Sequence, residues 1–71
     1  MALDLFRVPD VSCDQCVRAI TQAVGALPGV RLVTVSLADK SVRVEHDGNV
    51  DPAALIRAIN AAGYQDVSML V

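Results

Sequence analysis

The sequence is short of aromatic residues, cysteines and long apolar stretches, and each shortage excludes a class of protein. Phe6 and Tyr64 are its only aromatic residues, and tryptophan is absent. The longest unbroken run of apolar residues and glycine covers 23–27, far below the roughly 20 residues of a membrane-spanning helix. Two cysteines are too few for the disulfide framework of a small secreted domain. We therefore expect neither a membrane segment nor a disulfide-stabilised fold.

Basic residues are also too sparse and too scattered for a nucleic-acid-binding protein. Six basic against eight acidic side chains give a net charge of −2. The arginines do not form a basic run, and no aromatic residues are interleaved with them. Nucleic-acid binding usually requires a clustered positive surface. The composition thus argues against nucleic acid as a partner.

The length and the apolar content predict one small folded domain. The 71 residues are 54% hydrophobic, which is too apolar for intrinsic disorder. A chain of this size buries only about 60% of its unfolded surface, so we expect a single domain over 1–71 with a modest stability that a bound ligand would raise. The first residues lack a basic segment followed by an apolar one, so no secretory signal is visible and we expect a cytoplasmic protein.

Hydrophobic periodicity predicts six structural elements in this chain. Alternating apolar residues favour strands, and apolar residues three or four positions apart favour helices. Asp51 is a good N-cap with Pro52 behind it, while Leu27-Pro28-Gly29 should stop the preceding helix. The expected strands cover 3–8, 33–37, 42–45 and 65–70, and the expected helices cover 14–27 and 52–63.

This order of elements, β-α-β-β-α-β, predicts the α+β ferredoxin-like fold: a four-stranded antiparallel sheet with two helices on one face. Right-handed crossovers would then bring the loop before the first helix, the turn at 39–40 and the loop at 63–64 to one end. His46 would lie at the opposite end, partly exposed and not a metal ligand. Met69 follows the strand periodicity, so we expect it in the core.

Cys13 and Cys16 are the one feature that carries chemistry, because they lie where the first helix should begin. Free backbone N–H groups and the helix dipole favour the thiolate at that place. Their spacing lets both sulfurs reach one ion, and soft thiolates select Cu(I), Zn(II) or iron–sulfur clusters. Clusters and structural zinc sites need four ligands, which two cysteines cannot supply, whereas Cu(I) accepts two.

Three segments resemble the heavy-metal-associated domain of small bacterial copper chaperones, namely 11–16, 27–30 and 62–64, and the resemblance covers essentially the whole chain. It implies that Cys13 and Cys16 hold a surface-exposed Cu(I) and that Tyr64 lies near the metal. It also implies a metallochaperone rather than an enzyme. Such a protein passes Cu(I) by thiolate exchange to the metal-binding domain of a copper-transporting P-type ATPase, and two copies could share one ion.

The sequence departs from the family pattern Gly-Met-Thr/Ser-Cys-x-x-Cys before the first cysteine. Asp10 and Val11 replace Gly and Met, and Gln15 replaces the histidine often found before the second cysteine. Val11 can still fill the core. Asp10 and Asp14, by contrast, bring hard oxygen ligands close to the sulfurs, with Ser12 between them. A zinc or cadmium carrier with a carboxylate as third ligand therefore stays open as an alternative.

A thiol–disulfide oxidoreductase that uses Cys13 as nucleophile and Cys16 as resolving thiol is a second alternative. Against it, no tryptophan precedes the first cysteine, no proline separates the pair, and the chain is shorter than a thioredoxin-type fold. Arg18 on the first helix and Lys40 in the hairpin turn lie near the expected metal end. They could help to select a docking partner.

Overall fold

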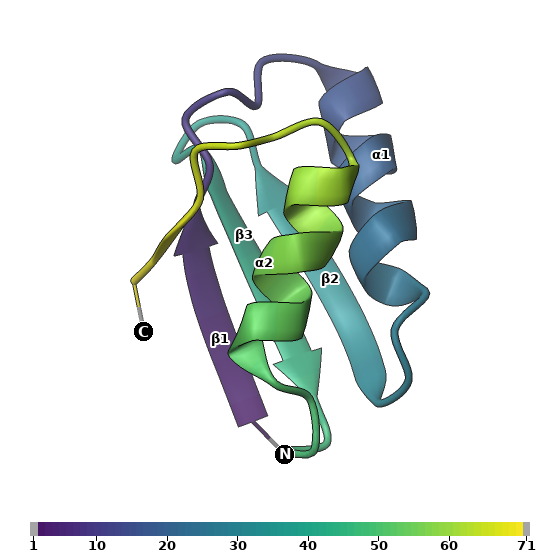
Figure 1. The fold of residues 1–71 in the computed structure, drawn as a ribbon. Coiled ribbons are helices and arrows are strands. Elements are labelled where there is room, and N and C mark those ends of the chain that lie inside the picture. The colour runs from purple at the N-terminus through teal and green to yellow at the C-terminus, as the bar shows by residue number, and fades with distance from the viewer. Residues whose placement is uncertain (1, 71) are drawn as a thin grey trace.

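Residues 2–70 are described by the computed structural model, and they form one antiparallel sheet with both helices on the same face (Figure 1). The sheet order is β2-β3-β1-β4. This arrangement confirms the predicted ferredoxin-like fold. The elements are β1 (Ala2–Arg7), α1 (Asp14–Gly25), β2 (Val30–Ser36), β3 (Ser41–His46), α2 (Pro52–Ala61) and β4 (Ser68–Met69).

The two helices begin where the sequence predicts, but their N-caps differ. Asp51 caps α2 by accepting a hydrogen bond from the N–H of Ala53 at 2.9 Å, and Pro52 follows it. Cys13 is the N-cap of α1 and makes no side-chain capping bond, which leaves its sulfur free. Within residues 2–70, neither helix is long and apolar enough to cross a membrane.

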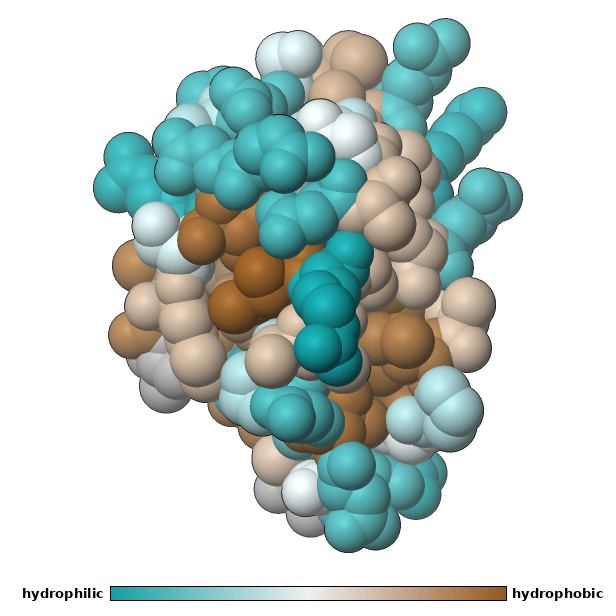
Figure 2. Space-filling view, viewed as in Figure 1, coloured by the Kyte–Doolittle hydropathy of each residue, from teal (hydrophilic) through white to brown (hydrophobic). Residues whose placement is uncertain are grey.

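The core lies between the helices and the sheet. Val11 is fully buried there, which confirms that valine fills the core position where the family has methionine. On the helical face, polar side chains of α2 stand in the middle with apolar side chains visible on either side (Figure 2). The buried apolar side chains are Phe6, Val8, Val11, Ile20, Val24, Val42, Val44, Val50, Leu55 and Ile59.

Three connections meet at one end of the molecule, as the topology predicts. The chain from β1 to α1, the turn from β2 to β3 and the chain from α2 to β4 all lie at the top in Figure 1. The turn is joined to the end of β1 by a hydrogen bond from the N–H of Val8 to the carbonyl of Lys40, at 2.8 Å. The loop that carries the cysteines is therefore packed beside the hairpin turn.

The prediction for the last strand and for Met69 was wrong. A strand was expected over 65–70, yet β4 has two residues and pairs only with β1, at the edge of the sheet. Met69 lies opposite Phe6 in that pairing, but the residue is 45% exposed. An edge strand has a neighbouring strand on one side only. Periodicity therefore predicts the face of the sheet on which Met69 lies, but not whether other residues bury its side chain.

His46 is buried rather than partly exposed, which corrects a second expectation. It is 3% exposed and its Nε2 lies 2.7 Å from Oδ2 of Asp4, which is itself 9% exposed. The N–H of Gly48 donates to Nδ1 of His46 at 3.1 Å. Because a backbone N–H can only donate, Nδ1 is the acceptor and Nε2–H donates to Asp4. The pair closes the end of the core opposite the cysteines.

Candidate metal centre

The two thiols lie side by side at the start of α1. The Sγ atoms of Cys13 and Cys16 are 3.7 Å apart, and both thiols are free. The carbonyl of Cys13 accepts hydrogen bonds from the N–H groups of Cys16 and Val17, at 3.1 and 3.3 Å. This first helical turn brings the sulfur of Cys16 close to that of Cys13. Cys13 is exposed and Cys16 half-buried, so one ion held between them could be reached from solvent.

Tyr64 is the main cause of an acidic Cys16. The pKa of Cys16 is lowered from 9.0 to about 7, chiefly by the hydrogen bond from the Tyr64 hydroxyl and next by one from the backbone of Ser12. Burial opposes this effect, and the thiol and backbone of Cys13 add to it. The same bond is the main cause that raises the pKa of Tyr64 to about 12, so at neutral pH the tyrosine stays protonated and is the hydrogen-bond donor. The start of the helix predicts a lowered cysteine pKa. The sequence did not predict that the hydroxyl of Tyr64 would be the largest cause.

Replacing Tyr64 with phenylalanine should raise the pKa of Cys16 from about 7 towards 9.0, because the thiolate loses its strongest hydrogen-bond donor. A higher pKa means less thiolate at neutral pH, so alkylation of Cys16 at pH 7 should slow by about threefold to tenfold. Iodoacetamide labelling followed by peptide mass spectrometry, run across a pH series, measures this for each cysteine separately. An unchanged midpoint for Cys16 would show that the hydroxyl does not stabilise the thiolate.

Asp10, Ser12 and Asp14, the three polar residues expected around the cysteines, are all exposed at this end, and each relates differently to the thiols. Ser12 acts on Cys16 through its backbone. The charge of Asp10 is felt at Tyr64, where it adds slightly to the raised pKa. Asp14 is the first residue of α1. Within residues 2–70, no three side chains of His, Cys, Asp or Glu group closely enough to hold an ion; the arrangement offers two sulfurs.

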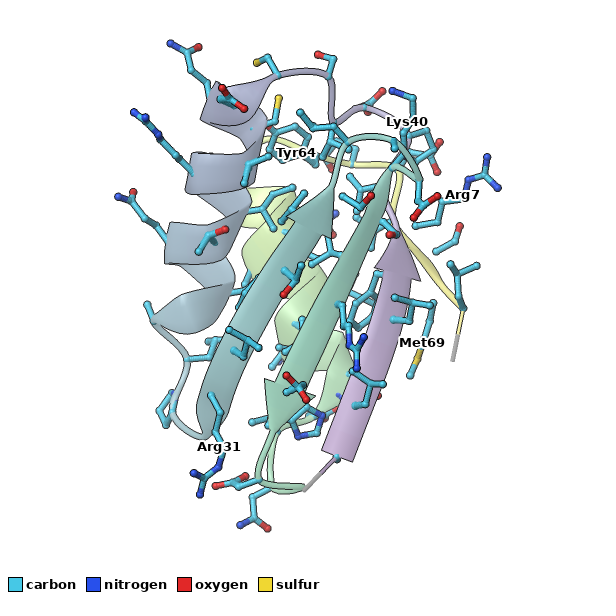
Figure 3. The ribbon with its side chains drawn as sticks, turned by 180° about the vertical axis from the view of Figure 1, so that it is seen from behind. Arg7, Arg31, Lys40, Tyr64 and Met69 are labelled. Carbon is cyan, nitrogen blue, oxygen red and sulfur yellow. The ribbon has the colours of Figure 1, made fainter. Side chains whose placement is uncertain are left out.

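Lys40 touches the cysteine loop directly, a contact that the sequence did not suggest. Its Nζ donates to the carbonyl oxygen of Val11 at 3.0 Å, and its side chain lies at the same end as Tyr64 (Figure 3). Arg18 stands exposed on α1. One indication of the contact made by Lys40 was available from the sequence, namely the topology, which places the turn at 39–40 beside the cysteine loop.

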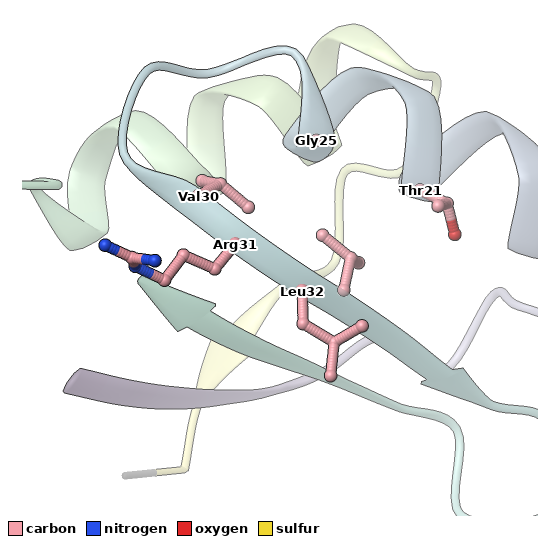
Figure 4. Close-up of a pocket in the computed structure, with 6 residues that line it drawn as sticks. Thr21, Gly25, Val30, Arg31 and Leu32 are labelled. Atoms are coloured by element: carbon pink, nitrogen blue, oxygen red, sulfur yellow. The ribbon is translucent and has the colours of Figure 1, made fainter. Parts of the chain in front are cut away.

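A surface cavity of about 260 Å³ lies elsewhere, between α1 and β2 (Figure 4). Neither cysteine lines it. Its walls are Thr21, Gly25, Val30, Arg31, Leu32 and Val33. The thiols therefore lie on an open surface rather than in this cavity.

Known proteins resemble this chain over most of its length. The copper chaperone CopZ of Enterococcus hirae is 41% identical over 61 residues, which are 84% of this chain and 88% of that protein. Copper-transporting ATPase 2 of Rhizobium meliloti is 39% identical over 59 residues, 83% of this chain. The solution structure of apo-CopP from Helicobacter pylori matches with a TM-score of 0.82 and 35% identity, covering 93% of this chain and 98% of that one.

The lengths of these relatives differ greatly. The chain spans about 7% of the length of the Rhizobium ATPase, whereas it spans most of the small Enterococcus chaperone. Residues 5–65 match the heavy-metal-associated domain, and this range includes the cysteine pair and Tyr64. Fold, motif and relatives agree: the chain belongs to the heavy-metal-associated domain family.

Proposed function

We propose that this chain, as a single domain over 1–71, is a metal carrier and not an enzyme: it binds Cu(I) between Cys13 and Cys16 in the cytoplasm. It then passes the ion to the metal-binding domain of a copper-transporting P-type ATPase. The observation that carries the proposal is the pair of free thiols, 3.7 Å apart on an open surface. The names of the Enterococcus chaperone and the Rhizobium ATPase support this choice of cargo and partner.

The donor set favours Cu(I) as the cargo. Thiolates are soft ligands and Cu(I) is satisfied by two of them. Cys16 has a pKa of about 7, so proton loss from this thiol needs little help from the metal at neutral pH. Zn(II) prefers four ligands in a closed site, and within residues 2–70 no third His, Cys, Asp or Glu side chain completes a group with the two sulfurs.

Transfer would be a ligand exchange with no change of oxidation state. A thiolate of the partner attacks the two-coordinate ion from the side of Cys13, which is exposed. One sulfur–copper bond forms as another breaks, and the departing thiolate takes up a proton from solvent. Because copper stays bound to sulfur throughout, no free ion is released.

Direct exchange is tested by its dependence on partner concentration. The Cu(I)-loaded chain, labelled with ¹⁵N, is mixed with the isolated metal-binding domain of a copper-transporting ATPase, and native mass spectrometry follows the copper. We expect a transfer rate that rises with the concentration of the partner and exceeds the rate of release to a chelator. A rate that does not depend on the partner would mean that the ion dissociates first, which contradicts carrier-to-acceptor exchange.

Asp10 is the residue that favours the second candidate, a zinc or cadmium carrier, so its replacement separates the two. Two thiolates and Cu(I) leave a net charge of −1, which a nearby carboxylate opposes, whereas the same pair with Zn(II) is neutral and accepts a carboxylate ligand. Asp10→Gly should therefore strengthen Cu(I) binding by about fivefold, the effect of one like charge worth on the order of 1 kcal/mol. It should weaken Zn(II) binding.

The control for Asp10→Gly is Glu45→Gln, which changes the net charge equally. Glu45 lies beside His46 near the opposite end of β3. Competition titrations with both metals on the three proteins measure the affinities. A parallel change of the two metals in Asp10→Gly would show that the carboxylate acts on the loop and not on the bound ion.

A further inference from the structure

Lys40 is hydrogen-bonded to both ends of the turn at 8–11, which leads from β1 into the cysteine loop. Its carbonyl accepts a hydrogen bond from the N–H of Val8 at 2.8 Å, and its Nζ donates to the carbonyl of Val11 at 3.0 Å. The turn closes on itself, because the N–H of Val11 donates to the carbonyl of Val8 at 3.2 Å. One residue of the hairpin turn thus fixes a segment 29 positions earlier in the chain.

The carbonyl that Lys40 binds belongs to the same peptide group as the N–H of Ser12. In a planar trans peptide, the C=O and the N–H point in opposite directions. On its other side this peptide faces Cys16, whose sulfur is hydrogen-bonded by the backbone of Ser12. The contacts therefore form a chain: ammonium of Lys40, peptide Val11–Ser12, sulfur of Cys16. Hydrogen bonds in a chain polarise one another, most strongly when one end is charged.

The backbone conformation of Lys40 supports a structural role for its side chain. Its φ of 55° makes it the only non-glycine residue with a positive φ within residues 2–70. That conformation suits glycine or asparagine better than lysine. Strain of this kind is typically retained where the surrounding structure uses the residue. The lysine side chain supplies what glycine and asparagine lack, namely reach to Val11 and a positive charge.

We propose that Lys40 is a positioning residue for the metal centre: its ammonium orients the peptide between Val11 and Ser12 so that the Ser12 N–H faces the Cys16 sulfur. The same contact holds the segment before Cys13, which has no side-chain cap of its own. In the Cu(I) complex, this cation and this N–H offset the net negative charge of the two thiolates. This last step rests on the proposed function, whereas the orientation of the peptide belongs to the metal-free protein.

Lys40→Asn tests the proposal without imposing backbone strain, because asparagine tolerates a positive φ and is too short to reach Val11. In the reduced, metal-free protein, we expect hydrogen exchange of the Ser12 amide, measured by NMR, to accelerate by about tenfold, the factor for one charge-assisted hydrogen bond. The Cu(I) affinity, measured against a chelator, should fall by about threefold to tenfold. The melting temperature should not fall, and core amides should keep their exchange rates.

Two further variants make the result specific. Lys40→Arg keeps the charge and the reach and should restore both the slow exchange of Ser12 and the Cu(I) affinity. Arg18→Gln removes one positive charge from exposed α1 and should change neither. The proposal is overturned if Ser12 keeps its protection in Lys40→Asn, if the Cu(I) affinity stays at the wild-type value, or if Arg18→Gln has the same effect. A wild-type chain that binds no Cu(I) would refute the proposed function instead, and the exchange of Ser12 would still decide the role of Lys40.

Discussion

Replacing both Cys13 and Cys16 with serine is expected to lower the affinity for Cu(I) by at least about a thousandfold, because hydroxyls are hard ligands that bind a soft ion poorly. Cys13 is exposed and Cys16 only half-buried, so the change should leave the fold intact. The measurement is a competition titration against a Cu(I) chelator, with circular dichroism and thermal melting to check the fold.

The single variants Cys13→Ser and Cys16→Ser serve as controls for the double one. Each keeps one sulfur, so each should bind Cu(I) more weakly than the wild type and more tightly than the double variant. Retained wild-type affinity in a folded double variant would show that copper binds elsewhere, and the candidate site would be wrong.

Replacing His46 with alanine is expected to have the largest effect on stability. The carboxylate of Asp4, whose side chain is 12% exposed, would lose the hydrogen bond that it accepts from Nε2 at 2.7 Å. Removing one partner of a buried pair leaves the other without compensation, at a cost of about 2–4 kcal/mol. A domain of this length has about 4–10 kcal/mol in all. The free energy of unfolding from urea denaturation should therefore fall by a large share of its total.

The double variant Asp4→Val/His46→Leu separates loss of the pair from loss of volume. It removes both polar groups, so it should recover part of the stability that His46→Ala loses. Since the pair closes the end opposite the thiols, all these variants should bind Cu(I) with wild-type affinity. If His46→Ala unfolds no more easily than the wild type, the buried pair does not stabilise the fold; if it binds Cu(I) much more weakly, the placement of His46 is wrong.

The sequence is enough to predict most of the fold, because its local signals agree with one another. The caps at 51–52, the stop at 27–29 and the alternation around 33–37 each favour the element that is found there. What periodicity cannot supply is register. Asp4 and His46 meet because Ala2 lies opposite His46 and Asp4 opposite Val44 when β1 pairs with β3, and nothing local to either residue indicates a buried partner 42 positions away.

The candidate site divides in the same way. The pair Cys13 and Cys16 could be found from spacing and from its place at the start of a helix. The topology predicts that Tyr64 lies at the same end of the molecule, and the family resemblance implies that it is near the metal. Its hydrogen bond to Cys16 could not be predicted, because that bond depends on how the loop after α2 crosses the end of the sheet. The contact of Lys40 with Val11 depends on a side chain reaching across the fold. Patterns along the chain do not predict such a contact between a side chain and a distant segment.

One measurement tests most directly the claim that Cys13 and Cys16 form a Cu(I) site. The reduced protein is titrated with Cu(I) and Zn(II) in competition, and native mass spectrometry reads metal identity, stoichiometry and any dimer in which two copies share an ion. We predict that Cu(I) displaces Zn(II) and that one ion is bound per chain or per pair of chains. Preferential retention of Zn(II) in the presence of equal Cu(I), or metal binding that persists after both thiols are alkylated, would contradict it.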